Sequence, residues 1–213
     1  MNSTFFFEKG VVMKKQFDER NLTMVMDFYE LTMANGYFKD EDKERKVAFD
    51  VFYRKNPDNA GYAIFAGLEP VSYTHLRAHE TVLDLYSSAA SDVYKRQDED
   101  DIEYLRGQGL FGEEFLTYLA DFKFRGDIYS FPEGTIMYPN EPVITVVAPL
   151  LDAQLVETAI LLQVNHQSLI ATKTRRIVRS AKGRAVSDFG ARRAHNMDAA
   201  VYGARAAYIG GAV

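Results

Sequence analysis

The sequence predicts an α/β fold. Segments with apolar residues at helical spacing alternate with short stretches rich in β-forming residues. The 213 residues are 47% hydrophobic and include 15 Phe, which is enough to form a substantial core. Near the end of the chain, one strand–loop–helix unit is typical of an α/β barrel, but a single unit cannot close one.

The first third of the chain predicts a helix followed by a hairpin. Apolar and small residues recur at helical spacing over about 25–35, which predicts a helix. Residues 46–54 alternate between apolar and polar and predict a strand, and 56–61 form a turn cluster. Residues 62–66 predict a second strand, so we expect the two strands to pair.

The middle of the chain predicts two helices and then strands. Acidic residues at 98–101 complement the start of one helix, and 113–121 predict another. Residues 122–130 predict a strand, and a further strand pair is expected to end near 145–147. The glycines of 107–112 match a dinucleotide-binding pattern, but they follow a helix instead of a strand and favour a helix end.

The last third predicts long helices around one short strand. Residues 150–182 form the longest helical stretch, with a break expected around 165–167. Residues 183–188 predict a strand and 199–208 an alanine-rich helix. The segment after this strand would lie at its carboxyl end, which is where ligands bind in parallel α/β sheets.

Three parts are expected along the chain. Met13, followed by two lysines, resembles a second start, so residues 1–12 are expected to be an untranslated leader. Residues 13–148 are expected to form an N-terminal α/β domain, and 149–213 the incomplete start of a second domain. Residues 72–97 resemble translated sequencing-adapter DNA, so we expect a foreign segment in place of a natural helix.

Composition excludes several functions. The net charge of −5 argues against nucleic acid as a partner. The absence of cysteine excludes disulfides, thiolate catalysis and zinc–cysteine sites. No apolar run is long enough to cross a bilayer, so we expect a cytoplasmic protein without membrane contact. His75 and His79 have metal-binding spacing beside Glu80, but a further ligand is missing and the segment is suspect, so no metal site is expected.

Two short segments far apart carry the candidate binding residues. The segment 26–33 contains Tyr29, and the segment 188–193 contains Phe189 and Arg192. Aromatic faces stack on flat rings, and arginine forks bind carboxylate or phosphate. Either aromatic residue alone would more often belong to a core, but together they indicate a site for a flat anionic ring beside phosphates.

Three other polar residues have simpler interpretations. Glu157 and His166 stand among apolar neighbours, and buried polar groups need partners, so structural hydrogen bonds are expected for both. His195 is expected to be a loop residue.

In order and spacing, seven stretches resemble the N-terminal part of a nicotinate phosphoribosyltransferase. These stretches are 27–37, 49–57, 67–69, 104–105, 154–158, 165–168 and 188–194. The resemblance implies that the intact enzyme converts nicotinate and phosphoribosyl pyrophosphate into nicotinate mononucleotide and pyrophosphate, coupled to hydrolysis of ATP with Mg²⁺. It also implies a homodimer with a shared active site. The fold that it implies is a small N-terminal α/β domain followed by the beginning of an irregular (β/α) barrel, the phosphoribosyltransferase barrel domain, which starts within 149–213 and is truncated.

The same resemblance implies roles for individual residues. Tyr29 and Phe189 would sandwich the pyridine ring, from opposite subunits. Arg192 would contact the anionic groups of the substrate, and Arg54 would reach phosphate from the neighbouring subunit. The other substrate-binding candidates are Asp188, expected to orient Arg192 or the nearby backbone, and Arg193.

No catalytic residue is assigned, because the phosphorylated histidine of the family is expected beyond Val213. We therefore expect the chain as given to be inactive. Two alternatives stay open: an enzyme of the nicotinamide-using sister family and a non-catalytic α/β fragment. The Arg192–Arg193 pair and the stretch 52–57 favour the acid-using branch. A dinucleotide oxidoreductase would rest on the glycines of 107–112 alone, and their position after a helix argues against it.

Overall fold

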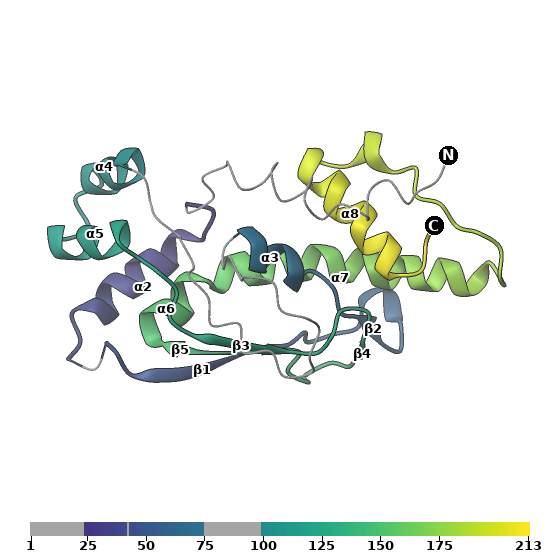
Figure 1. Cartoon of the computed structure of the whole chain (residues 1–213), viewed down its shortest axis with the longest axis horizontal. Coiled ribbons are helices and arrows are strands. Elements are labelled where there is room, and N and C mark those ends of the chain that lie inside the picture. Colours follow the sequence, from purple (N-terminus) through teal and green to yellow (C-terminus); the bar gives the residue numbers. More distant parts are fainter. Residues whose placement is uncertain (1–23, 42, 75–98) are drawn as a thin grey trace.

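The computed structural model describes residues 24–41, 43–74 and 99–213 (Figure 1). The expected leader, the foreign segment beyond Thr74, and His75, His79 and Glu80 lie outside the described residues. These expectations therefore stay predictions, as does the division into domains. Within the described residues, no helix is long and apolar enough to cross a membrane.

Two small antiparallel sheets form one side of the fold. The larger has the order β1-β5-β3, with β5 (Ile144–Pro149) between β1 (Lys46–Val51) and β3 (Asp127–Ser130). Alternate residues of β5 are buried, as expected of a strand with one face on the core. The smaller sheet pairs β2 (Ala63–Ile64) with β4 (Ile136–Met137).

The expected hairpin is wrong. β1 pairs with β5 along its whole length, from Lys46 opposite Pro149 to Val51 opposite Ile144. The second expected strand is reduced to the two residues of β2, which pair with β4. The alternating pattern of a strand reveals which face is buried, but it does not reveal which other strand supplies the backbone partners.

The helices near the N-terminus agree with the sequence. α2 (Phe28–Phe38) begins three residues later than the expected helix, at the residue after Asp27. α4 (Glu99–Gly107) and α5 (Glu113–Ala120) lie where they were expected. Gly109 has a φ of +67°, so the glycine-rich stretch ends a helix and has no dinucleotide-binding context. In Figure 1, α2, α4 and α5 gather at one end of the molecule.

The other helices form a second group. α3 (Leu68–Thr74) and α6 (Leu150–Leu155) are short, and α7 (Glu157–Ser180) is the longest helix described. α8 (Met197–Ile209) confirms the expected C-terminal helix and packs on α7 (Figure 1). Two single turns of 3₁₀ helix, η2 (Pro57–Asn59) and η3 (Ala191–Arg193), precede β2 and α8 respectively.

The break in the long helix lies earlier than expected. It falls at Val156, with φ −102° and ψ −4°, and α7 continues through residues 165–167. Polar residues there do not interrupt the helix because they have partners: Gln167 bonds to Arg205, and Ser168 bonds to both the backbone N and O of Ala66. The start of α7 is instead set by contacts with α2, described below.

The short strand expected at 183–188 is also wrong. This segment is irregular in the described structure. Within it, Val186 O accepts a hydrogen bond from the backbone N of Val213 at 2.8 Å. A strand needs a neighbouring strand to satisfy its backbone, and no described strand lies beside this segment. The described residues therefore form a mixed α/β fold, in which no barrel is seen.

The core lies between the larger sheet and the helices α2, α5 and α6. The largest apolar side chains of this core are each at most 1% exposed. These residues are Leu31, Phe65, Leu105, Phe115, Leu116, Leu119, Ile144, Leu151, Leu155 and Ile160. This core holds the start of α2 against the start of α7, where the first candidate site residue lies.

Candidate functional site

Two clefts among the described residues are lined by three of the candidate site residues, Tyr29, Asp188 and Arg193. The first, of about 570 Å³, lies between the end of β1 and α7, and it is lined by Tyr29 and Lys55. The second, of about 380 Å³, lies between α7, α8 and the segment 186–195. Asp188, Arg193 and His195 line this second cleft.

Tyr29 is held at the start of α2 with its ring half in solvent. Its side chain is 46% exposed, and its hydroxyl donates a hydrogen bond to Oε1 of Glu157 at 3.1 Å. The other carboxylate oxygen of Glu157 accepts from Nε2 of Gln154 at 2.8 Å. Burial, followed by the hydrogen bond to Glu157 and the negative charge of that carboxylate, together raise the pKa of Tyr29 to about 12. The phenol is therefore a neutral donor with an accessible ring.

A buried carboxylate fixes the position of this tyrosine. Glu30 is fully buried, and its Oε1 accepts from Thr158 N at 2.9 Å and from Thr158 Oγ1 at 2.7 Å. The backbone N of Asp27 donates to the same hydroxyl at 3.2 Å. Because Glu30 caps the first turn of α7, the two helix starts are tied together. The sequence analysis missed Glu30 and Thr158; an acidic residue on the apolar face of α2 was the available signal.

The second segment is a loop shaped by Asp188. Its Oδ1 accepts from the backbone N of Gly190 at 2.8 Å, so Asp188 contacts the backbone. A Cβ at Gly190 would lie 2.9 Å from that same oxygen, so a larger residue there would displace the side chain of Asp188. Phe189 is 75% exposed, and Arg192 Nη1 lies 3.5 Å from the carbonyl oxygen of Phe189. Arg193 is exposed and is the last residue of η3.

The structure brings some predicted residues together and separates others. Asp188, Phe189, Arg192 and Arg193 share one loop, next to the start of α8. Tyr29 belongs to the other cleft. The predicted stacking uses Tyr29 from one subunit and Phe189 from the other. The positions of these two residues within one chain do not test it, so it stays a prediction.

Arg54 lies apart from both groups. β1 ends at Val51, so Arg54 follows the strand instead of ending it, and its side chain is exposed. Its neighbour Lys55 lines the first cleft. The role predicted for Arg54 stays a prediction.

Glu157 and His166 both make the hydrogen bonds expected of them. Glu157 accepts from Tyr29 and Gln154, as described above. His166 lines the second cleft, with Nε2 3.4 Å from the carbonyl oxygen of Ala199. His195 lies in the loop before α8, as expected.

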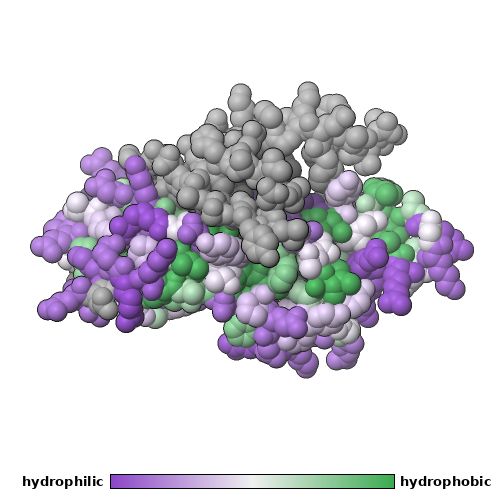
Figure 2. All heavy atoms as spheres, turned by 60° about the horizontal axis from the view of Figure 1, so that its bottom comes forward, coloured by the Kyte–Doolittle hydropathy of each residue, from purple (hydrophilic) through white to green (hydrophobic). Residues whose placement is uncertain are grey.

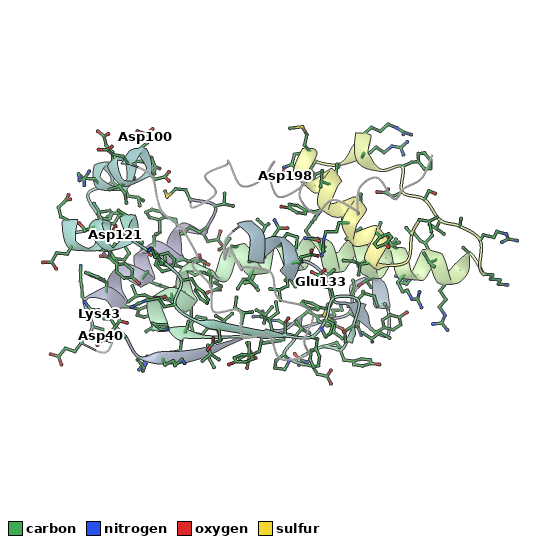
Figure 3. All side chains as sticks on the ribbon, viewed as in Figure 1. Asp40, Lys43, Asp100, Asp121, Glu133 and Asp198 are labelled. Carbon is green, nitrogen blue, oxygen red and sulfur yellow. The ribbon has the colours of Figure 1, made fainter. Side chains whose placement is uncertain are left out.

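An ion-pair cluster supports the helix that follows the loop. Arg205 of α8 donates to Glu69, to Glu133 and, at 2.9 Å, to Oε1 of Gln167. The second oxygen of Glu133 accepts from the backbone N of Gly67, Leu68 and Glu69 at 2.7, 2.8 and 3.1 Å. Figure 3 shows Glu133 beside α7. One carboxylate therefore caps α3 and holds α8.

Comparisons with known proteins give the class and then the family. A family model described as the nicotinate phosphoribosyltransferase (NAPRTase) N-terminal domain matches residues 24–78 and 94–165. Together with the mixed α/β fold, the match defines the class as a domain of phosphoribosyltransferases. The chain belongs to the nicotinate phosphoribosyltransferase N-terminal domain family. The interruption of the match falls within the stretch predicted to be foreign.

Curated relatives support the same family. The chain is 44% identical over 186 residues to "Nicotinate phosphoribosyltransferase pncB2" of Mycobacterium tuberculosis, covering 87% of this chain and 36% of that protein. It is 42% identical over 195 residues to "Nicotinate phosphoribosyltransferase" of Bacillus subtilis, covering 92% of this chain and 36% of that protein. The chain thus spans about 36% of the length of these relatives.

Solved structures share the fold. The crystal structure of human nicotinic acid phosphoribosyltransferase matches with a TM-score of 0.72 and 27% identity, covering 89% of this chain and 35% of that one. The nicotinate-nucleotide pyrophosphorylase of Pyrococcus furiosus matches with a TM-score of 0.61 and 26% identity, covering 92% of this chain and 38% of that one.

Proposed function

We propose that this chain is the N-terminal part of a nicotinate phosphoribosyltransferase. The intact enzyme joins nicotinate to phosphoribosyl pyrophosphate and releases nicotinate mononucleotide and pyrophosphate, with coupled hydrolysis of ATP. The proposal includes a homodimer and a cytoplasmic location. The family membership and the curated relatives support the reaction.

One observation carries the proposal: two aromatic side chains are held out into solvent by fixed local structure. Tyr29 is 46% exposed on a segment tied to α7, and Phe189 is 75% exposed on a loop shaped by Asp188. A planar ring needs one aromatic face on each side, and each stacked pair contributes roughly 0.5–1.5 kcal/mol beyond area burial. Since the two residues line different regions of one chain, a second subunit would bring Tyr29 to Phe189.

The remaining site residues suit the charges of the reaction. The pyridine nitrogen must meet C1 of the ribose as pyrophosphate leaves, so positioning and charge stabilisation dominate catalysis. Arg192 and Arg193 are exposed beside Phe189, where guanidinium groups would bind the carboxylate of nicotinate or the ribose phosphate. Arg54 would reach phosphate from the neighbouring subunit.

ATP and Mg²⁺ belong to the proposal only for the intact enzyme. Among the described residues, no group of three or more His, Asp or Glu side chains is placed to hold a metal ion. Magnesium at phosphate sites is usually held by one or two carboxylates together with the phosphates of the substrate, so no residue of this chain is assigned to it.

A chimera tests the proposed function. It carries residues 24–71 and 99–213 of this chain in place of the matching parts of the Bacillus subtilis relative, which keeps its own intervening segment. We expect it to form nicotinate mononucleotide from nicotinate and phosphoribosyl pyrophosphate. Tyr29→Ala and Phe189→Ala should each lower kcat/KM roughly tenfold or more. Tyr104→Ala is the matched control, because Tyr104 is 61% exposed on α4 and should leave kcat/KM unchanged.

Three results would contradict the proposal. An inactive chimera would contradict the proposed reaction. If both alanine variants were as active as the unmodified chimera, the proposed stacking of the substrate ring between Tyr29 and Phe189 would be refuted. A higher kcat/KM with nicotinamide than with nicotinate would assign the chain to the sister family. The 213-residue chain alone is expected to show no turnover, and product formation by it would refute that expectation.

A further inference from the structure

Glu157 lies at the start of α7 directly beside the hydroxyl of Tyr29, and the proposed chemistry has so far left it unused. Both of its carboxylate oxygens are held, by Tyr29 at 3.1 Å and by the buried Gln154 at 2.8 Å. The first turn of a helix favours a negative charge, so α7 stabilises the carboxylate there. Glu157 is therefore a fixed negative charge beside the ring of Tyr29.

We propose that Glu157 is a positioning residue of the nicotinate site, which acts through Tyr29 to favour the substrate ring as a pyridinium cation over the neutral ring. The inference rests on the proposed function. In that reaction, the lone pair of the pyridine nitrogen forms the bond to C1 of the ribose. The bond between C1 and the pyrophosphate oxygen breaks, and its electron pair leaves with pyrophosphate. The ring nitrogen becomes positively charged as a result.

The charged side chains that act on the hydroxyl of Tyr29 are all acidic. They are Asp27, which precedes α2, Glu30 of α2 and Glu157 of α7, whereas the cation Lys55 lines the same cleft. A phenol that donates its proton to a carboxylate keeps a ring rich in electrons, and the face of such a ring attracts a cation. Because the attraction grows only as the substrate ring becomes cationic, it stabilises the transition state more than the bound substrate.

A purely structural role for Glu157 can be separated from this one. The starts of α2 and α7 are already joined by Glu30 and Thr158, independently of Glu157. Glu157→Gln keeps the size of the side chain and an oxygen that accepts from Tyr29, and the amide of Gln154 can turn over to match it. The substitution therefore removes the charge and preserves the shape.

The first test measures the phenol itself in the full chain. The 13 tyrosines are labelled with ¹³C at Cζ and titrated by NMR, and Tyr29→Phe identifies the signal of Tyr29. We expect Glu157→Gln to lower the pKa of Tyr29 from about 12 toward its ordinary value. Glu113→Gln is the matched control, since Glu113 also begins a helix but bonds to Arg106. An unchanged pKa in Glu157→Gln overturns the proposal.

The second test uses the chimera described above. We expect Glu157→Gln to lower kcat about threefold, with little change in the KM for nicotinate. It should weaken inhibition by 1-methylnicotinate, a permanent pyridinium, by a similar factor while leaving inhibition by benzoate unchanged. Equal losses for both inhibitors, or an unchanged kcat, overturn the proposal and leave the proposed function intact. An inactive parent chimera is instead the failure of the proposed function.

Discussion

Glu30 and Tyr29 are neighbours in the chain with opposite environments. Glu30 points into the protein and is fully buried, whereas Tyr29 is 46% exposed. The buried carboxylate of Glu30 fixes the position of the exposed ring of Tyr29, because its hydrogen bonds to Thr158 determine where α2 contacts α7. A sequence that places an acid on the apolar face of a helix shows that a partner exists, but the partner here is 128 residues away.

The raised pKa of Tyr29 predicts a pH dependence of stability. Its value of about 12 in the folded chain lies above the ordinary value of 10.0, so the folded state holds the proton more tightly. The stabilisation is fully present below pH 10 and is lost as the pH rises toward about 12. Tyr29→Phe should therefore make the decline in the urea midpoint over this range shallower. An identical decline in both proteins would contradict the prediction. Burial also raises the pKa of Tyr118, so part of the decline should remain.

Gly67 predicts a large loss of stability on substitution. It has a φ of +110°, and a Cβ there would lie 2.3 Å from the carbonyl oxygen of Gln163. Strained backbone and overpacking each contribute roughly 1–3 kcal/mol, so Gly67→Ala should lower the free energy of unfolding by about 3 kcal/mol or more. Gly36→Ala is the control, because nothing lies within 4 Å of its added Cβ and it lies inside α2. The control should raise stability by about 0.5–1 kcal/mol in urea unfolding. Equal changes in the free energy of unfolding for Gly67→Ala and Gly36→Ala would contradict the expectation.

At the scale of elements, Glu133 and Arg205 connect three helices. Arg205 of α8 reaches Glu133, which caps α3, and also Gln167 of α7. The side chains of Arg205 and Glu133 are only 10% and 17% exposed, so neither charge is well solvated without the other. The position of the loop that carries Phe189 depends on this cluster, since the loop runs directly into α8.

Removing the carboxylate of Glu133 that caps α3 should therefore lower the stability of the fold. Glu133→Ala leaves three backbone N–H groups without this acceptor and takes one carboxylate from Arg205. The free energy of unfolding should fall by about 3–5 kcal/mol, as for other broken buried pairs. Glu113→Ala breaks an exposed pair with Arg106 and should change the urea midpoint little. Similar losses in the free energy of unfolding for Glu133→Ala and Glu113→Ala would contradict the prediction.

Elements with a strong local pattern could be predicted from the sequence, whereas their partners could not. The helices α4, α5 and α8 carry their own apolar periodicity and were placed correctly. The pairing of β1 with β5 joins residues about a hundred positions apart, which no local pattern contains. The segment 183–188 has a strand-like composition but lies beside no described strand. Tertiary partners therefore decided each element that the sequence placed wrongly.

At the scale of the whole molecule, a group of large apolar side chains is exposed around the first cleft. They are Phe52 at 46%, Leu161 at 41%, Leu162 at 50% and Leu169 at 47%. Figure 2 shows hydrophobic patches between hydrophilic regions on one face of the molecule. Single exposed apolar residues are ordinary, but a contiguous group favours contact with another protein surface.

This group predicts self-association of the chain. We expect Leu162→Lys and Leu169→Lys to increase the monomer fraction measured by sedimentation velocity, because each would place a charge in the contact. Leu110→Lys is the matched control, since Leu110 is 56% exposed away from the cleft and should leave the distribution unchanged. A distribution that is the same in all variants would show that this surface is not the contact.

The site could be predicted only where its residues carry a chemical signature. The aromatic and arginine residues of the two segments stood out by type and spacing, and they led to the family that the comparisons show. Glu157 could be assigned a hydrogen bond but not a partner, because Tyr29 is 128 residues distant. The start of a barrel stays a prediction, since the chain spans about 36% of the length of its curated relatives.

The capping of α3 by Glu133 has a consequence for synthesis on the ribosome. The carboxylate that accepts from Gly67 N stands 66 positions later in the chain, and the bond from Arg205 to Glu69 spans 136 positions. As the polypeptide emerges from the exit tunnel, α3 lacks these contacts until both Glu133 and Arg205 have been synthesised. Translation must therefore have passed Arg205 before this junction can mature, so a nascent chain that stalls earlier exposes an unfinished helix to chaperones and proteases.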